Sequence, residues 1–151
     1  LHDLVLRTAS QMRLRLKSGA LPDLLLAAID GFGVSAEFAY GPLTDATVYK
    51  IGNGAAYPEQ DIQPADSVVT RLATTDGIGK GRLASTGFLY EGFRRNVQGR
   101  GSLGFRKVIR KELSGEHPLS TEITRRQDLP FAGLTDCSPI ALNPESSTGC
   151  R

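Results

Sequence analysis

Residues 24–40 read LLLAAIDGFGVSAEFAY and contain the strongest hairpin signal in the chain. The turn stretch Asp30-Gly31-Phe32-Gly33 separates an apolar run from a second run, Val34–Tyr40, in which apolar and polar residues alternate. An Asp-Gly pair between two such runs is typical of a tight antiparallel turn. We therefore predict a hairpin over residues 24–40, with Gly31 and Gly33 as its turn glycines.

The same two-residue period recurs along the chain, in runs at 12–17, 67–73, 83–90, 103–109 and 122–126. Turn-rich stretches at 76–81 and 114–118 separate neighbouring runs, and residues 41–64 are expected to be mostly loop with a short strand at 47–51. Only the first 20 residues compete as helix, and their alternation weakens that alternative. The prediction is a mainly β fold, an antiparallel hairpin-rich sheet whose edges need flanking sequence or other chains.

Composition narrows the function classes. The 151 residues carry a net charge of +2 and are 40% hydrophobic, which suits one domain and calls for neither nucleic acid nor an anionic membrane. The apolar run at 21–29 is about half as long as a membrane span and contains Asp23, so no membrane insertion is expected. Because the first residue is Leu1, we expect a processed or excised piece of a longer protein.

Gly99, Gly101 and Gly104 lie in the stretch NVQGRGSLGFRKV (96–108) and match the pattern G-x-G-x-x-G. A dinucleotide loop leaves a buried strand and enters a helix, but residues 92–98 are not an apolar strand and those after Gly104 alternate as a strand. The acidic residue that such a site requires would have to be Glu122. We therefore assign the three glycines to a turn or bulge and predict no cofactor.

Other candidate sites have simpler explanations. Basic residues interleaved with Phe93 and Phe105 could form a nucleic-acid surface, but a solvated strand face is the preferred interpretation; they are Arg94, Arg95, Arg100, Arg106 and Lys107. Asp61 and the stretch 76–79 could bind calcium loosely, but the spacing of a dedicated loop is missing. No nucleic acid and no metal are predicted.

No catalytic residue is predicted either. His2 and His117 have no Ser or Cys nucleophile in a recognisable setting. The remaining carboxylates lie in or beside turns, where Asp caps the backbone: Asp23, Asp30, Asp45, Asp61 and Asp128. Cys137 and Cys150 could close a surface disulfide or remain free thiols, and the sequence leaves both open.

Several stretches, taken in order, resemble one family segment. They are 21–25, 30–33, 40–45, 48–50, 57–61, 76–79, 98–106 and 126–131. Together they resemble bacterial Rhs/YD-repeat and insecticidal Tc-toxin B-type proteins, in the region after the SpvB-type FG-GAP propeller and before the YD repeats. The resemblance covers residues 21–133. Residues 1–20 match poorly, and residues 134–151 are expected to form a flexible tail.

The resemblance implies a role as well as a fold. In that family this region belongs to large secreted proteins whose strands spiral into a hollow shell around a C-terminal toxin. It implies a non-catalytic shell segment that contacts flanking segments or subunits, is secreted or displayed on the bacterial surface, and can self-associate. The alternative is a free-standing extracellular binding or adhesion module that uses an exposed sheet edge or face.

Overall fold

The computed structural model describes residues 4–7, 12–15, 23–75, 83–114 and 119–136. These residues form strands and loops and include no helix, which confirms the mainly β prediction. The strands are β1 Leu4–Arg7, β2 Met12–Arg15, β3 Ala27–Ile29, β4 Ser35–Pro42, β5 Tyr49–Lys50, β6 Glu59–Asp61, β7 Ser67–Thr75, β8 Leu83–Asn96, β9 Gly101–Glu112 and β10 Ser120–Thr124.

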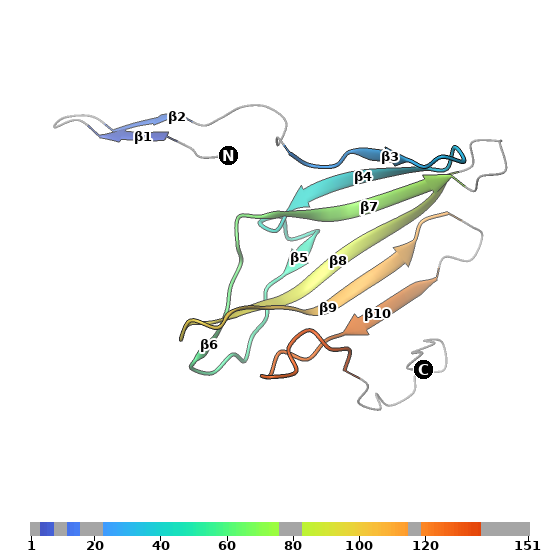
Figure 1. Cartoon of the computed structure of the whole chain (residues 1–151). Helices are drawn as coiled ribbons and strands as arrows, with labels where there is room; N and C mark the ends of the chain where they lie inside the picture. Colours follow the sequence, from blue (N-terminus) through green and yellow to red (C-terminus); the bar gives the residue numbers. More distant parts are fainter. Residues whose placement is uncertain (1–3, 8–11, 16–22, 76–82, 115–118, 137–151) are drawn as a thin grey trace.

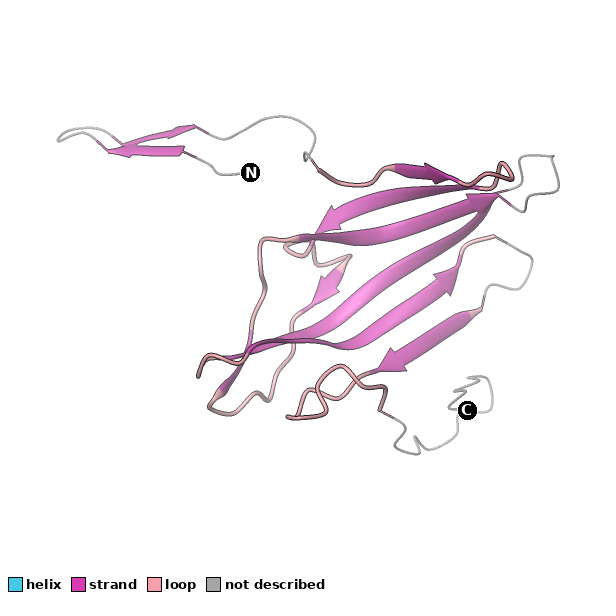
Figure 2. Ribbon diagram, viewed as in Figure 1, coloured by secondary structure: helices cyan, strands magenta, loops and turns pink. Residues whose placement is uncertain are grey.

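One open sheet dominates the molecule (Figures 1 and 2). Its main path runs β10-β9-β8-β7-β4-β3, and every pair along this path is antiparallel. The short strands β5 and β6 also pair with β8, β5 in parallel and β6 in antiparallel orientation. Strands β1 and β2 form a separate antiparallel pair. The antiparallel, hairpin-rich architecture is therefore confirmed.

The predicted hairpin at 24–40 is present as β3 and β4, with Ala28 opposite Ala36. At its turn, one carboxylate oxygen of Asp30 accepts hydrogen bonds from the backbone N–H groups of Phe32 and Val34, both at 2.9 Å. Gly33 has a φ of 85°, in the left-handed region that favours glycine, whereas Gly31 does not. An Asp cap and one left-handed glycine thus define the turn.

The structure differs from the predicted elements in two places. β8 continues to Asn96, whereas sequence reasoning assigned no strand to residues 92–96. The 41–64 region contains β6 in addition to the expected short strand, observed as β5. The alternating run at 12–17 is confirmed as a strand over 12–15, and the weaker helix alternative is wrong over 4–7 and 12–15, which are strands. The expected turn at 76–81, and all of the turn at 114–118 except Ser114, lie outside the described residues.

Strand β8 organises the sheet because three strands share one of its sides. β7 pairs with its first part, from Leu83 to Gly87; β5 pairs at Tyr90 and Glu91, and β6 pairs from Arg94 to Asn96. The other side of β8 pairs with β9 from Thr86 to Asn96. The segment from 43 to 64, which lies within the region 41–64 expected to be mostly loop, thereby completes the sheet along the second half of β8.

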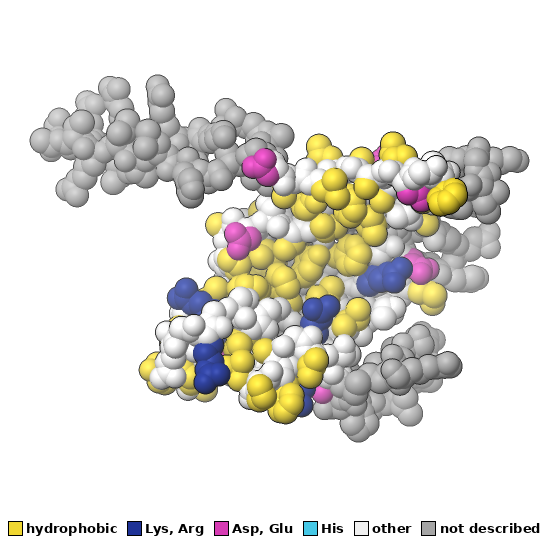
Figure 3. All heavy atoms as spheres, in the orientation of Figure 1, with side chains coloured by type: hydrophobic (Ala, Val, Ile, Leu, Met, Phe, Trp, Pro, Cys, Tyr) yellow, Lys and Arg dark blue, Asp and Glu magenta, His cyan; other side chains and the backbone are white. Residues whose placement is uncertain are grey.

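The described residues bury few apolar side chains. The buried ones are Leu43, Tyr49, Ala73 and Leu103. Strand register places Phe38 beside Leu72, Tyr40 beside Val69, and Tyr90 beside Val108 on neighbouring strands, and these side chains are only half-buried. Figure 3 shows hydrophobic side chains gathered over β3, β4, β7 and β8 on the face that it presents. The sheet thus keeps a broad apolar surface in contact with solvent.

The Asp30 cap yields a stability prediction. Asp30→Ala removes the acceptor for two turn N–H groups and should lower the free energy of unfolding by about 0.5–1.5 kcal/mol. Asp30→Asn keeps an oxygen at the same position and should lose less than Asp30→Ala. Urea unfolding followed by circular dichroism measures both; equal losses for the two variants would contradict the assignment of the cap.

Candidate functional site

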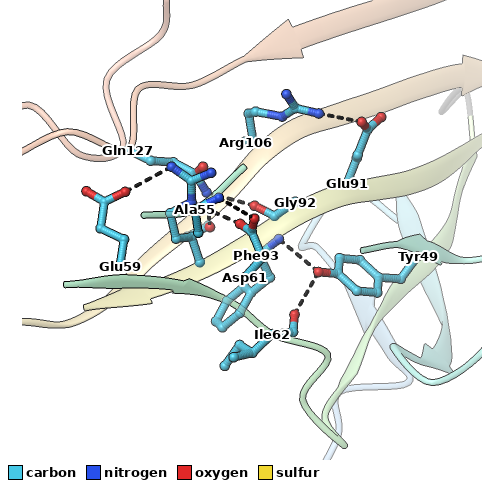
Figure 4. A network of polar contacts seen from close by, with 12 residues as sticks. Tyr49, Ala55, Glu59, Asp61, Ile62, Glu91, Gly92, Phe93, Arg106 and Gln127 are labelled. Atoms are coloured by element: carbon cyan, nitrogen blue, oxygen red, sulfur yellow. Dashed lines mark hydrogen bonds and ion pairs between the residues drawn. The ribbon is translucent and has the colours of Figure 1, made fainter. Parts of the chain in front are cut away.

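The densest group of polar contacts lies where β6, β8 and β9 meet (Figure 4). Arg94 of β8 forms its centre, between two carboxylates of β6. Its Nε lies 2.9 Å from Oδ1 of Asp61, and its Nη1 lies 2.9 Å from Oε2 of Glu59. The antiparallel register aligns Asp61 with Arg94 across the strands, so strand pairing brings this ion pair together.

Electrostatics keep this cluster charged. Burial alone would raise the pKa of the Asp61 carboxyl, but hydrogen bonds from Arg94 and from the Ala55 N–H, with the charge of Arg94, hold it below its ordinary value. Burial alone would lower the pKa of Arg94, but its bonds to Asp61 and Glu59 raise it. A carboxylate held in this way stays ionised at neutral pH and is a poor general acid or base.

Tyr49 of β5 holds the 43–64 segment against β8. Its side chain is buried, and its hydroxyl donates to the Ile62 carbonyl at 2.8 Å and accepts from the Phe93 N–H at 2.9 Å. Burial raises the pKa of this hydroxyl above its ordinary value. The hydroxyl therefore ties two parts of the 43–64 segment together through the Ile62 carbonyl and joins this segment to β8 through the Phe93 N–H.

Gln127, which follows β10, satisfies two carbonyls at irregular positions of the sheet. Gly92 and Gly104 have φ values of 69° and 79°, which lie outside strand geometry. The buried Nε2 of Gln127 donates to the Gly92 carbonyl at 2.7 Å and to the Gly104 carbonyl at 2.8 Å. The side chain replaces ladder hydrogen bonds where β8 and β9 depart from regular pairing.

The irregularity at Gly92 also shapes the aromatic cluster. Strict alternation would place Tyr90 and Phe93 on opposite faces of β8, because they are three residues apart. Both rings nevertheless contact the ring of Phe105, with centroids 4.8 Å and 5.0 Å away. The positive φ at Gly92 lets the strand turn both rings to one side, and Tyr49 packs edge-on against Phe105.

The basic residues considered for a nucleic-acid surface are mostly engaged within the sheet. Arg94 pairs with Glu59 and Asp61, Arg106 with Glu91 at 2.6 Å, and Lys107 with Glu122 at 3.1 Å. Arg95 donates twice to the Gln60 side chain. Arg100 is exposed in the β8–β9 turn. These contacts are the arrangement expected of a solvated strand face with cross-strand pairs.

A shallow depression of about 600 Å³ lies over this network. Its lining includes Arg94, Arg106, Gln127 and the Arg126–Asp128 pair, whose guanidinium also stacks on Phe131 at 4.4 Å. The described lining holds no His, Ser or Cys; its one hydroxyl is that of Thr124, and its carboxylates Glu59 and Asp128 are paired with arginines. The ion pairs of Arg94 hold β6 against β8, and the bonds of Gln127 hold the segment after β10 against β8 and β9.

The five turn glycines differ in what they do. Gly99, Gly101 and Gly104 all have positive φ, at 89°, 78° and 79°, in the turn between β8 and β9 and in the bulge beyond it. They lead into the antiparallel strand β9 rather than into a helix. Gly33 has the same property and Gly31 does not. This backbone geometry differs from that of a dinucleotide loop, whose helix supplies the phosphate-binding N–H groups.

The aspartates weighed for catalysis have local roles. Asp30 and Asp45 accept backbone bonds within their own turns, Asp128 pairs with Arg126, and Asp23 has a positive φ of 66°. Asp61 departs from the turn interpretation, because it lies in β6 and pairs with Arg94. No group of three His, Cys, Asp or Glu within the described ranges could hold a metal. His2, His117, Cys137 and Cys150 lie outside these ranges.

Sequence reasoning missed the residues that join the segments. Tyr49 and Gln127 were not singled out, because a lone Tyr in a loop region and a lone Gln beside a strand carry no periodic signal. The two carboxylates of Glu59-Gln60-Asp61 could have suggested pairing with Arg94-Arg95, since opposite charges favour cross-strand neighbours. The segment after β10 folds back on it as far as Asp136, whose N–H donates to the Thr124 carbonyl, so ordered structure extends past the expected tail boundary at 134. Residues 137–151 lie outside the described residues.

Comparisons of the chain with models of known families, with curated proteins and with solved structures found no match. Among the described residues there is also no helix with the length and apolar character of a membrane span.

The positive φ of Gly101 allows a test of the glycine motif. Gly101→Val has free space around its side chain but must adopt a left-handed backbone, so it should lower the free energy of unfolding by about 1–2 kcal/mol or more. Gly31→Ala, which also has open space but no positive φ, is the control and should change little. Micromolar binding of NAD, FAD or ATP by the wild-type chain in calorimetry would overturn the turn assignment.

The Arg94 cluster predicts a pH-dependent stability. The pKa of Asp61 is depressed in the folded chain, so its contribution is present above the unfolded-state value near 3.9 and is lost as pH falls through the folded value. Arg94→Met should therefore cost about 2–3 kcal/mol at neutral pH and progressively less below about pH 4. Lys107→Met, which breaks the more exposed pair with Glu122, should cost under about 1 kcal/mol.

Urea melts across pH would measure these differences. A wild-type advantage over Arg94→Met that stayed constant down to strongly acidic pH would contradict the role of the Asp61 charge.

Proposed function

We propose that this chain is a non-catalytic structural segment of a secreted Rhs/Tc-B-like toxin shell that encapsulates a C-terminal effector. The proposal joins the stretches between residues 21 and 133 that resemble this family with the architecture of the sheet. It rests on one observation above others: the described sheet is open, and its apolar face is only half-buried. Such a sheet gains stability from neighbours that continue it, as adjoining segments of a shell would.

The polar network supports a structural role. Its carboxylates are paired with arginines, and its buried hydroxyl and amide are bonded to backbone groups. Burying these groups with satisfied partners fixes the geometry of the sheet. On this proposal its partners are flanking shell segments or subunits, and the protein functions outside the cell that makes it or on that cell's surface.

The surrounding genes provide the decisive test of this proposal. We expect coding sequence for FG-GAP propeller repeats upstream and for YD repeats downstream, in frame with this segment or in a fragmented version of the same gene. Neighbouring genes with neither repeat would overturn the shell assignment and favour the free-standing adhesion module.

The proposal also predicts marginal stability for the isolated chain. Burying a large apolar side chain is worth roughly 1.5–3 kcal/mol, so leaving several half-exposed removes much of a typical stability of about 5–15 kcal/mol. We expect a free energy of unfolding at or below about 5 kcal/mol in urea melts. A sharp transition at high urea from a chain that sediments as a monomer would instead fit an independent binding module.

A further inference from the structure

The two edges of the large sheet differ in how they are protected. At the β10 edge, the carbonyl of Thr124 accepts a hydrogen bond from the Asp136 N–H, and Glu122 is paired with Lys107. At the β3 edge, residues 27–29 are all exposed and pair with β4 alone among the described residues. Charged side chains and covering segments are how sheets block unwanted pairing, so β3 is the less protected edge.

The hydrogen-bond pattern shows which backbone groups of β3 are free to pair. The Leu26 carbonyl accepts from the Phe38 N–H, and the Asp30 N–H donates to the Val34 carbonyl. Because these bonds alternate in an antiparallel pair, Ala28 also faces β4, whereas the N–H and C=O groups of Ala27 and Ile29 face outward. An additional strand can bond to those groups without disturbing the hairpin.

The side chains along this edge define the strand that would fit. Large apolar side chains are exposed: Leu25 at 56%, Leu26 at 66%, Ile29 at 74% and Phe32 at 95%. The charged residues of the hairpin and its approach are all acidic, exposed and outside any ion pair within the described residues; they are Asp23, Asp30 and Glu37. Apolar contacts and negative charge together favour a strand that alternates apolar and basic residues.

Pairing of β3 with β3 of a second copy does not meet this requirement. It would bring two sets of the same acidic residues together, and like charges across strands are destabilising. Strand β2, in contrast, has the sequence MRLR, which alternates apolar and basic residues. Among the described residues, β2 and β1 pair with each other and with no strand of the large sheet, so one side of β2 has no described partner.

We propose that the β3 edge binds β2 of a second copy of this chain, so that two chains exchange their β1–β2 hairpins. The exchange is reciprocal, and each dimer contains two identical β2–β3 contacts. It adds a two-stranded ribbon to each sheet, covers the outward groups of Ala27 and Ile29, and brings the basic sequence of β2 to the acidic edge of the sheet. This proposal does not depend on the shell assignment, because it concerns contacts between copies of this chain alone.

The first experiment blocks the acceptor edge. Ala27→Pro removes an outward N–H and leaves the β3–β4 bonds in place, since proline is tolerated at such edge positions. Ser120→Pro is the matched control, because the bond from the Glu112 N–H to the Leu119 carbonyl makes the Ser120 N–H face outward on the opposite edge. In sedimentation equilibrium of the full chain, Ala27→Pro should weaken dimerisation at least about tenfold, a change of roughly 1.4 kcal/mol, while Ser120→Pro should leave it unchanged.

The second experiment separates strand exchange from general self-association. Arg13→Glu combined with Arg15→Glu reverses the charge of β2 and should also weaken the dimer. Mixing this variant with Ala27→Pro leaves one intact acceptor edge and one intact β2, so a labelled mixture should form heterodimers more tightly than either variant associates alone. Raised ionic strength should weaken the wild-type dimer, because its charge contacts are exposed.

The outcomes decide the proposal in either direction. Three results would overturn it: a wild-type chain that stays monomeric, a dimer that survives Ala27→Pro, or a mixture without heterodimers. A monomeric wild-type chain would instead fit docking of β2 onto β3 within one chain. If circular dichroism shows that Ala27→Pro does not fold, Glu37→Arg replaces it. That reversal should weaken the dimer, and adding Arg13→Glu and Arg15→Glu in the same chain should restore it.

Discussion

The backbone of β8 must find hydrogen-bond partners on both sides over 14 residues, and the rest of the sheet depends on how it does so. β7 pairs only with the first part of β8, so β5 and then β6 pair with the rest of the same side. Between the parts of β8 that pair with β5 and with β6, Gly92 departs from strand geometry. Its carbonyl accepts a hydrogen bond from the Gln127 side chain. The ion pairs of Arg94, the hydroxyl contacts of Tyr49 and the aromatic packing on Phe105 all lie around this change of partner.

Much of the fold could be predicted because its signals are local. Asp30-Gly31 between two apolar runs is sufficient to predict the β3–β4 hairpin, and period-two alternation locates most of β4, β7 and β9. The glycines of the β8–β9 turn could be assigned to backbone geometry for a related reason: the alternation of residues 105–109 excludes the helix that a phosphate-binding loop requires.

The features that could not be predicted depend on contacts between distant segments. Residues 92–96 (GFRRN) do not alternate as an exposed strand should, because Gly92 disrupts the period and Arg94 is held by carboxylates some 35 positions earlier in the chain. β6 is three polar residues whose strand character comes from pairing with β8. β5 runs parallel to β8, an orientation that a two-residue strand cannot signal in sequence. Gln127 likewise gains its role from carbonyls freed elsewhere.

The segment between β4 and β7 has a consequence for how such a chain can evolve. Its two ends are tied together, since the Leu43 N–H donates to the Asp66 carbonyl and the Gln63 side chain donates to the Leu43 carbonyl. Between them, β5 and β6 each hold a register on β8. Most surface connections accept insertions and deletions freely, but a changed length here shifts the pairing of β5 or β6. We therefore expect the length of this connection to be constrained as tightly as that of a strand.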